Sequence, residues 1–599
     1  MTEQHALVSP SRALGAVLAA AALVVLPLAL SEADIYKLGL VVIVFVGAVG
    51  LHILVNWAGE LSLGHAALIG APAFLVAKLS ADHGVSTAAL LPLGLLVGAF
   101  IGTVVGLPAL RARGLQVALV TFAAAIAIDR YFFTKEWFVG PAGGARVDPP
   151  DLGVATLTTA KSLWVFLAVL VVLAVVVAWL LYHSKIARGL LWMSADPAAA
   201  SAFGIPIGRY RVLAYSIAGA YAGFAGALTT MWVQRLTPAA FPIRLSFTYL
   251  IIVALAGTGF LPGVALAALF VEGGRLFLPG AEAIVLYGAP IGLIITLTRY
   301  RGGLNGALAR SADLLRRRRP SVGAPEPDEH LAPVAAITPL VRPASKTPLL
   351  DVRDVRVSFG GLQAVDGVSL HVDEGAMVGL IGPNGAGKTT LFNCITGHQR
   401  INSGRVLFDG RDITRLRPHR CAQLGIGRSF QNLGLMVHET VDRNVMAAQH
   451  LGAGYAGWDV LAGPWRWARG ERRLAARTRD ALDAFGLAEE HDRPVEDLQF
   501  AAARFAELAA VVVESPRLVL LDEPTTGLDA GEIARLVKVL ERLRGDGATV
   551  LVIAHDVGFV MGCCDYVYVL SEGHILSEGL PEDVQRDQSV IDTYLGMSA

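Results

Sequence analysis

A glycine-rich stretch in the second half of the 599-residue chain has the residue types and spacing of a phosphate-binding loop. The sequence MVGLIGPNGAGKTTLF, residues 377–392, passes from an apolar segment through several glycines to Lys388 and Thr389. Glycines let backbone amides surround phosphate oxygens, a helix N-terminus adds positive potential, and lysine supplies a full charge. We therefore expect ATP phosphates to be bound, with Thr389 as a Mg²⁺ ligand, by Gly382, Pro383, Asn384, Gly385, Ala386, Gly387, Lys388, Thr389 and Thr390.

Two acidic residues and a histidine follow at the ends of two later apolar segments. RLVLLDEP, residues 517–524, ends in Asp522 and Glu523, and VLVIAHD, residues 550–556, leads into His555. A carboxylate such as Asp522 is suited to hold Mg²⁺, and one such as Glu523 to polarise the attacking water. His555 is expected to reach the γ-phosphate. Each short motif is weak evidence alone, but the three in this order predict ATP hydrolysis.

The motifs need strands and helices that bring their polar residues together. In each motif an apolar segment with the pattern of a buried strand leads directly into the polar residues, and a helix is expected to begin after the glycine-rich loop. An α/β fold of the P-loop type is therefore predicted for the second half of the chain.

Composition divides the chain into two unlike halves. Hydrophobic residues make up 54% of the chain and the mean hydropathy is +0.55, which is too apolar for an ordinary soluble protein. Charged residues are sparse up to about residue 300 and frequent afterwards. The formal net charge of zero leaves no basic surplus that would argue for nucleic acid. All four cysteines lie in the second half without metal-site spacing, as expected of small hydrophobic residues in a reducing cytosol.

The first half contains repeated apolar segments long enough to cross a membrane, which needs about 20 residues each. About eight to ten spans are expected in an all-α domain, and the first is not read as a signal peptide because further segments follow it. The candidate segments lie near 12–30, 38–56, 62–79, 86–107, 115–133, 163–182, 211–232, 246–260, 263–278 and 284–299.

Basic residues between these segments predict the orientation, because they favour the cytoplasmic side. The groups concerned are 111–113, Lys185 with Arg188, Arg209 with Arg211, and 315–320. An even number of spans then places both termini and the soluble half in the cytoplasm.

Three domains are expected: a membrane domain at 1–310, a linker rich in proline and arginine at 311–347, and an ATPase domain at 348–599. The arginine run near the start of the linker is most simply a stop-transfer signal that contacts lipid headgroups. Glu272 and Arg275 lie three residues apart on one helical face; a structural pair near a segment end is favoured over a functional intramembrane pair.

The ATPase motifs, in their order, resemble the nucleotide-binding domain of ABC transporters over about residues 349–599. The resemblance implies an α/β core with a helical subdomain, and ATP and Mg²⁺ as cofactors. It implies that Phe359 in VSFGGLQAV stacks on adenine and that Gln431 in RSFQNLGLM senses Mg²⁺ and the membrane domain. Asp529 would contact a partner domain across a dimer.

The membrane half looks like the permease subunits of branched-chain amino-acid ABC importers. The resemblance rests on NWAGELSLGHAALIGA (56–71), GLPALRARGLQVALVTFA (106–123) and the segment 184–228, and it covers most of residues 35–300. Glu60 departs from the family, where an amide is usual. The segment 184–228 is the candidate for the helix that docks onto the ATPase. TVDRNVMAAQHLGAG and the C-terminal tail resemble the ATPases of the same family, so permease and ATPase are expected to be fused here.

The signature motif of ABC proteins, normally close to LSGGQ, departs from its usual form. The motif acts on the nucleotide of the opposite subunit through a serine hydroxyl and a glycine backbone at a helix N-terminus. Neither residue is present in the aligned positions, although AAARFAELAAVVV still predicts a helix. A weakened signature is favoured over a tolerated variant at Leu498, Gln499, Phe500, Ala501 and Ala502.

The leading hypothesis is ATP-driven import of branched-chain amino acids or related small solutes across the cytoplasmic membrane. The resemblance implies a second permease and a second ATPase, expected as different chains because a homodimer would have two weak signatures, and an extracytoplasmic solute-binding protein. The alternatives are an importer of urea or short amides, a fused half-exporter that works as a homodimer, and an ATPase used for regulation.

Overall fold

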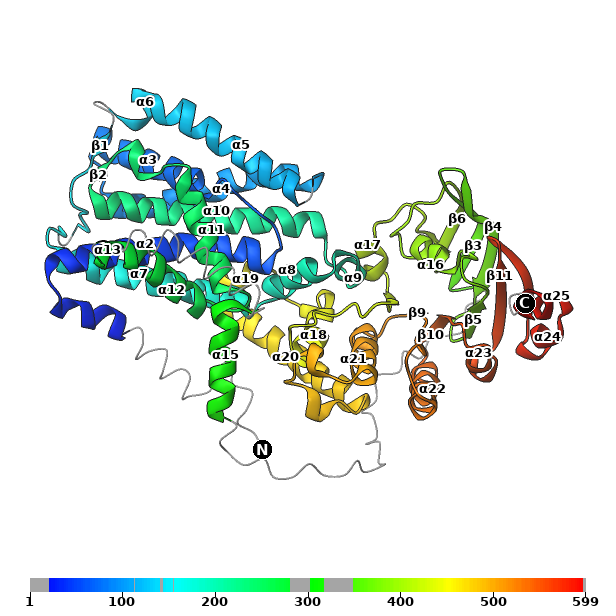
Figure 1. Ribbon diagram of the computed structural model, residues 1–599. Helices are drawn as coiled ribbons and strands as arrows, with labels where there is room; N and C mark the ends of the chain where they lie inside the picture. The colour runs from blue at the N-terminus through cyan, green and yellow to red at the C-terminus, as the bar shows by residue number, and fades with distance from the viewer. Residues whose placement is uncertain are drawn as a thin grey trace. The chain divides into compact units, whose positions relative to one another are not determined.

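The computed structural model describes residues 21–112, 114–140, 144–153, 156–278, 280, 302–316 and 348–595. The chain forms two compact units. Figure 1 colours the chain by residue number, from blue at the N-terminus to red at the C-terminus. The first unit comprises Met1–Ser194 and Gly208–Ala324, and the second comprises Ala195–Ile207 and Pro325–Ala599. The predicted span at 284–299, most of the linker and the first part of the segment 12–30 lie outside the described residues.

The described part of the first unit is helical apart from one short pair of strands, β1 (Ala145–Arg146) and β2 (Arg235–Leu236). Eight helices of this described part coincide with the apolar segments of the sequence. They are α2 (Glu32–His52), α3 (His65–His83), α4 (Thr87–Gly106), α5 (Leu115–Tyr131), α7 (Ala160–Tyr182), α10 (Ile207–Val233), α11 (Arg244–Ala256) and α12 (Pro262–Ala268).

Further helical pieces flank or connect these elements. They are η1 (Leu26–Ala29), the π-helical turn η2 (Ile53–Trp57), η3 (Leu107–Leu110), η4 (Phe132–Thr134), α6 (Glu136–Val139), α8 (Lys185–Ala195), η6 (Pro238–Ala240), the π-helical turn η7 (Leu269–Gly273), α13 (Gly274–Phe277) and α15 (Gly303–Arg316).

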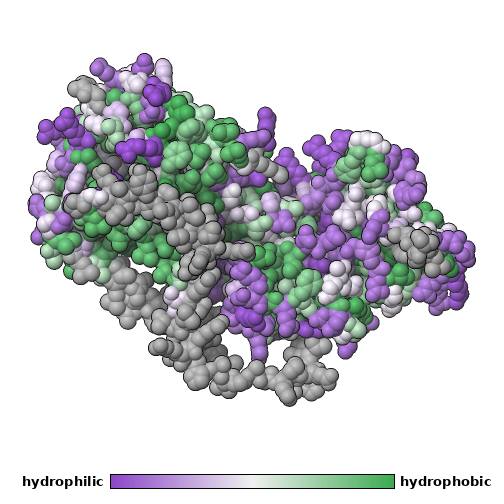
Figure 2. Space-filling view, viewed as in Figure 1, coloured by the Kyte–Doolittle hydropathy of each residue, from purple (hydrophilic) through white to green (hydrophobic). Residues whose placement is uncertain are grey.

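Six helical segments of the described chain are long and apolar enough to cross a membrane. In the most apolar window of α4 only 22% of residues are buried, against 72% for the segment that begins with α2. Apolar residues that stay exposed on a helix of this length are expected to face lipid, whereas α2 lies inside the bundle. Figure 2 shows hydrophobic residues, in green, spread over the visible surface of this unit.

Glycines let α4 and α10 come into backbone contact, as the small-residue content of the sequence predicts. A Cβ on Gly98 would lie 2.2 Å from the carbonyl oxygen of Gly219, and one on Gly223 would lie 2.2 Å from that of Gly94. Any larger residue at these positions would push the two helices apart.

Two helical hairpins of the first unit share a similar turn. The stretches AGELSLGHAAL (58–68) and AGTGFLPGVAL (256–266) follow α2–η2 and α11, and the second residue of each, Gly59 and Gly257, has a left-handed φ of 69° and 73°. Asn56 Nδ2 donates to the carbonyl oxygen of Gly257 at 2.9 Å, so the first hairpin caps the end of α11. The apolar segment predicted at 246–260 therefore ends its helix at Ala256.

The second unit is built on a six-stranded sheet in the order β12-β11-β5-β10-β9-β8, in which only β12 is antiparallel to its neighbour. A four-stranded antiparallel sheet, β4-β3-β6-β7, accompanies it. The strands are β3 (Leu350–Phe359), β4 (Leu362–Val372), β5 (Met377–Ile381), β6 (Ser403–Phe408), β7 (Arg411–Asp412), β8 (Ile426–Arg428), β9 (Leu518–Asp522), β10 (Thr549–Ile553), β11 (Tyr566–Ser571) and β12 (His574–Gly579).

Strands β5, β9 and β10 are buried at every position, as their continuous apolar sequences predict for central parallel strands. The helices of this unit are α9 (Pro197–Ala202), α16 (Lys388–Ile395), α17 (Pro418–Gln423), α18 (Val441–Ala448), η8 (Leu451–Ala453), α19 (Asp459–Ala462), α20 (Pro464–Ala484), η9 (Ala488–Glu490), η10 (Val495–Asp497), α21 (Phe500–Val512), α22 (Ala530–Gly545), α23 (Val557–Cys563), α24 (Pro581–Arg586) and α25 (Gln588–Leu595).

Candidate ATP site

The glycine-rich loop connects the central strand β5 to α16, which begins at Lys388. Gly387 precedes the helix with a φ of 101°, and a Cβ there would lie 2.2 Å from the carbonyl oxygen of Ala364. Gly385 also has a positive φ, of 83°, but the space beside it is open to 4 Å. The loop therefore exposes backbone where a phosphate would bind, at positions that only glycine occupies without strain.

Lys388 is held inside this loop. Its Nζ donates to the carbonyl oxygens of Gly382 at 2.6 Å and Pro383 at 2.9 Å, and the side chain is buried. Burial lowers the pKa of Lys388, and the carboxylates of Glu523 and Asp522 oppose that shift. A phosphate group at the loop would further favour the charged amine.

The acidic pair and the histidine lie at the ends of neighbouring strands. β10 pairs in parallel with both β5 and β9, so the loop, Asp522 at the end of β9 and the residues after β10 share one edge of the sheet. His555 Nε2 lies 2.6 Å from Glu523 Oε1. Glu523 is buried and adopts a left-handed φ of 50°, which is uncommon outside glycine. The structure thus brings together the three sequence motifs.

Asp522 has one carboxylate oxygen available to a cation. Its Oδ2 accepts a hydrogen bond from Arg428 Nη2 at 3.3 Å, whereas its Oδ1 is buried without a hydrogen-bond partner among the described residues. Burial raises the pKa of Asp522, with Arg428 opposing the shift. A buried oxygen that lacks a partner is costly unless a cation or proton binds it, so the site fits Mg²⁺. Thr389, the other predicted ligand on α16, is exposed.

Three further predicted residues lie on exposed parts of the unit. Phe359 ends β3 with 49% of its side chain exposed, so one face is available for a planar ligand. Gln431 is exposed, and its backbone carbonyl accepts from Arg504 at 3.4 Å. Asp529 is the N-cap of α22 and exchanges two 2.8 Å bonds with Glu532. Its side chain therefore has a role within this chain, which the sequence reading missed.

The divergent signature stretch forms the predicted helix. α21 begins at Phe500, and Gln499 at its N-cap makes no side-chain capping bond. Gln499 and Phe500 are exposed, while residues 503–512 are buried. The helix is thus anchored by its body, and its N-terminus is left open with its dipole and free amides.

A buried ion pair that the sequence analysis did not single out connects this helix to the ATP site. Arg504 Nη1 lies 2.7 Å from Glu507 Oε2, and both side chains are at most 2% exposed. Arg504 also donates to the carbonyl oxygen of Phe430 at 2.8 Å, while Glu507 accepts from the amides of Phe430 and Gly434. The pair fixes the segment around Gln431 to α21. An Arg and a Glu three residues apart in an otherwise apolar helix were its signal in the sequence.

The segment Ala195–Ile207, drawn from the predicted docking stretch 184–228, belongs to the second unit. Its helix α9 contacts α17. A Cβ on Gly434 would lie 3.1 Å from that of Ala199, which places α9 beside the loop that follows Gln431.

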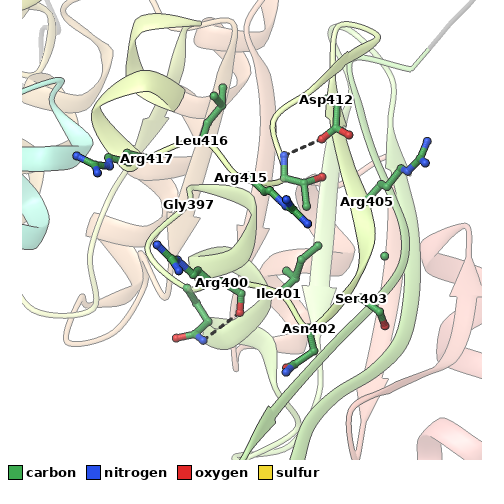
Figure 3. Close-up of a pocket in the computed structure, with 13 residues that line it drawn as sticks. Gly397, Arg400, Ile401, Asn402, Ser403, Arg405, Asp412, Arg415, Leu416 and Arg417 are labelled. Atoms are coloured by element: carbon green, nitrogen blue, oxygen red, sulfur yellow. Dashed lines mark hydrogen bonds between the residues drawn. The ribbon is translucent and has the colours of Figure 1, made fainter.

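A separate pocket of about 980 Å³ lies between the loop after α16 and the strands β6 and β7. Four arginines line it: Arg400, Arg405, Arg415 and Arg417. Figure 3 shows that Arg405 and Arg417 extend to opposite sides, so the four charges do not converge. None of the predicted nucleotide-binding residues lines this pocket.

Comparison with known families assigns both halves of the chain. Residues 365–526 match the family described as ABC transporter, and residues 35–275 match the branched-chain amino acid transport system permease component. The chain is 37% identical over 253 residues to the high-affinity branched-chain amino acid transport ATP-binding protein BraF of Pseudomonas aeruginosa, covering 42% of this chain and 98% of BraF.

Further similarities fall on the same region. The chain is 36% identical to LivG of Salmonella typhimurium, described in the same words, over 42% of this chain and 98% of LivG. Two solved ATP-binding cassettes of ABC transporters, one nucleotide-free and one in the ADP conformation, are 29% and 28% identical. They cover 41% and 42% of this chain and 99% and 100% of their own, each with a TM-score of 0.37.

Proposed function

Because this chain belongs to the branched-chain amino-acid transport family of ABC transporters, with permease and ATPase in one polypeptide, we propose that it imports branched-chain amino acids or related small solutes at the expense of ATP. The observation that carries the proposal is the fusion itself. A permease region and an ATPase of one transport family lie in one chain, and the ATPase has an assembled phosphate loop, acidic pair and histidine.

In this proposal each motif has one task in hydrolysis. The amides of the loop and Lys388 hold the β- and γ-phosphates, and Phe359 stacks on adenine. Thr389, Asp522 and Gln431 would hold Mg²⁺, which would neutralise charge on the phosphates when bound. Glu523 orients and polarises the attacking water, and its contact with His555 positions the histidine toward the γ-phosphate.

The proposed assembly is asymmetric. The signature of an ABC ATPase acts on the nucleotide of the opposite subunit, so the changes at Gln499 and Ala501 affect the ATP of a partner. The ATP on this chain would face the signature of the partner instead. A second permease and a second ATPase as different chains, with an extracytoplasmic solute-binding protein, complete the transporter.

The proposed domain limits are 1–310, 311–347 and 348–599, with the ATPase and both termini in the cytoplasm. The short helix α9 then couples the two functions, because it lies in the chain between α8 and α10 of the first unit and contacts α17 of the second.

The proposal is tested with the full chain and its co-purified partners in proteoliposomes, with solute-binding protein added on the outside. ATP enclosed in the vesicles should drive uptake of a labelled branched-chain amino acid, and Glu523→Gln should abolish it. A half-exporter predicts no requirement for the binding protein, and a regulatory ATPase predicts no uptake at all; either result would refute import.

A further inference from the structure

We propose that His398, Thr396 and Arg428 form a hydrogen-bonded relay by which α9 controls the Mg²⁺-binding carboxylate of Asp522. The inference rests on the proposed function in one respect, that α9 responds to transport. It makes Arg428 a positioning residue for Asp522 and assigns a coupling route that is separate from Gln431.

The relay begins at α9. His398 Nε2 lies 3.1 Å from the carbonyl oxygen of Ala198 and 3.2 Å from Ser201 Oγ. A carbonyl oxygen only accepts, and Ser201 Oγ already donates its own proton to that carbonyl at 2.8 Å. Nε2 must therefore carry the hydrogen in the neutral ring. The contact with α9 consequently fixes which tautomer His398 adopts.

The middle of the relay is a hydroxyl with two possible acceptors. With the hydrogen on Nε2, His398 Nδ1 is an acceptor, and Thr396 Oγ1 lies 2.9 Å from it. The same hydroxyl lies 2.8 Å from the carbonyl oxygen of Phe392 on α16. Its single proton serves one acceptor at a time, so the tautomer of His398 decides between two discrete arrangements.

The inner end of the relay is the guanidinium of Arg428. Its Nη1 donates to Thr396 Oγ1 at 3.1 Å and to Asn393 Oδ1 at 2.6 Å, and its Nη2 donates to Asp522 Oδ2 at 3.3 Å. The side chains of Arg428 and Asp522 are 3% and 2% exposed. The guanidinium also lies 5.0 Å from the ring centre of Phe430, which restricts its movement.

This geometry gives α9 a defined effect on the metal site. When α9 is in place, Thr396 donates to His398 and offers its lone pairs to Arg428. When α9 leaves, His398 is free to carry its hydrogen on Nδ1 and to donate it to Thr396, whose proton then returns to Phe392. Arg428 must then share Thr396 Oγ1 as an acceptor with His398. As a result, Arg428 positions Asp522 Oδ2 less firmly. Two alternative arrangements of this kind are what a physical coupling requires.

The test measures ATP hydrolysis by the full complex in nanodiscs as Mg²⁺ is titrated at fixed ATP and, in parallel, the binding of Mn²⁺ as a paramagnetic substitute for Mg²⁺; the two half-saturating concentrations should shift together. Arg428→Gln should raise the half-saturating Mg²⁺ concentration about tenfold or more, as loss of a residue behind a metal ligand does, and Arg428→Lys should recover part of it. Arg517→Gln is the matched control, because Arg517 also holds two carboxylates of this unit, Asp409 and Glu374. It should leave the Mg²⁺ dependence unchanged.

Thr396→Val and His398→Phe test the connection to α9. Thr396→Val should raise the half-saturating Mg²⁺ concentration by about two- to tenfold, because Arg428 loses an acceptor. His398→Phe should leave it near the wild-type value, because no second donor then competes with Arg428 for Thr396 Oγ1. The double variant should do no more than Thr396→Val alone, because both changes fall in the same relay. A larger shift in the double variant than in Thr396→Val, or an Arg428→Gln protein with wild-type Mg²⁺ dependence, would overturn the proposal. The readouts need only cation binding and ATP hydrolysis, so the expected shifts in a complex that takes up no solute would refute import and leave the relay standing.

Discussion

Repair of the signature stretch gives the sharpest test of asymmetry. The change is Gln499→Ser with Ala501→Gly, at the N-cap and in the first turn of α21. Gln499 makes no capping bond, so serine removes nothing from this chain and adds a short hydroxyl at the helix N-terminus. Glycine at position 501 removes a Cβ from the first turn of α21, where the proposed assembly would bring the phosphate of the partner's ATP close to the backbone. Its cost to the helix is at most about 1 kcal/mol.

The expected gain follows from the hydrogen bonds restored to a charged phosphate. Each is worth roughly 1.5–3 kcal/mol, and one bond that acts only in the transition state corresponds to roughly 10- to 150-fold in rate. In the proposed assembly the gain should fall on the ATP of the partner, because the signature would act across the dimer. Total turnover of the wild-type complex would hide it if the other site is already fast.

The assay therefore uses a chain whose own site is inactive. In a Glu523→Gln background, hydrolysis by the full complex is limited to the site of the partner and should be slow. Adding the two repairs should raise it at least about tenfold, whereas Ala502→Gly, one position further along α21, should have no such effect. An unchanged rate in a folded complex would show that the native stretch is a working variant, and the asymmetry would be refuted.

Three other variants test single elements of the structure. Phe359→Ala should raise the KM for ATP about two- to tenfold with little change in kcat, because aromatic stacking contributes roughly 0.5–1.5 kcal/mol to binding; an unchanged KM in steady-state assays would exclude an adenine contact. Glu60→Gln should lower the free energy of unfolding of the membrane domain by roughly 3–5 kcal/mol, because buried Arg211, whose Nε lies 2.8 Å from Glu60 Oε1, loses its counter-charge. Chemical unfolding measures the change. The double variant with Met at both positions should lose less stability, and an equal loss in the two variants would contradict this. Burial lowers the pKa of His398 to about 4; the positive charge of Arg428 also lowers it, and the negative charge of Asp196 raises it. Below pH about 6.5 the unfolded chain therefore takes up a proton at this histidine that the folded protein does not. The Tm of the wild type should therefore fall relative to His398→Gln between pH 6.5 and 4, and parallel curves would refute a buried neutral imidazole.

The sequence predicted the arrangement of the candidate ATP site more fully than the contacts that surround it. The phosphate loop and the acidic pair are local patterns, in which neighbouring residues carry the whole chemistry, and the structure places them at the ends of β5 and β9. Arg428 carried no such pattern. Its role depends on Asp522, which is distant in the chain, and on Thr396, and only the folded sheet brings the three together.

The membrane half shows the same division between local and tertiary information. Apolar length predicted most of the spans. The pair of Glu272 and Arg275 forms as its spacing suggested: Arg275 Nε lies 3.1 Å from Glu272 Oε2, and the side chain of Arg275, which belongs to α13, is half exposed. The end of α11 at Ala256 was not predicted, although Gly257, which follows it with a φ of 73°, is a typical residue after a helix end. The hydrogen bond from Asn56 of a distant hairpin to the carbonyl oxygen of Gly257 is visible only in the folded chain. The available sequence signal was the similarity of residues 58–68 and 256–266, which both begin with Ala-Gly and end with Ala-Leu.

In the proposed assembly the relay and the signature would act on different nucleotides, and this would decide how the fused chain is controlled. The relay from α9 ends at Asp522, so it would act on the ATP bound to the same chain. The N-terminus of α21 would act on the ATP of a partner. In an asymmetric assembly, the site with intact Asp522, Glu523 and His555 faces the signature of the partner and is the one that turns over. The permease part of this chain is then coupled through α9 to the productive site. Loss of the relay should consequently reduce transport more than the same loss in a partner, whose ATP faces the weakened signature.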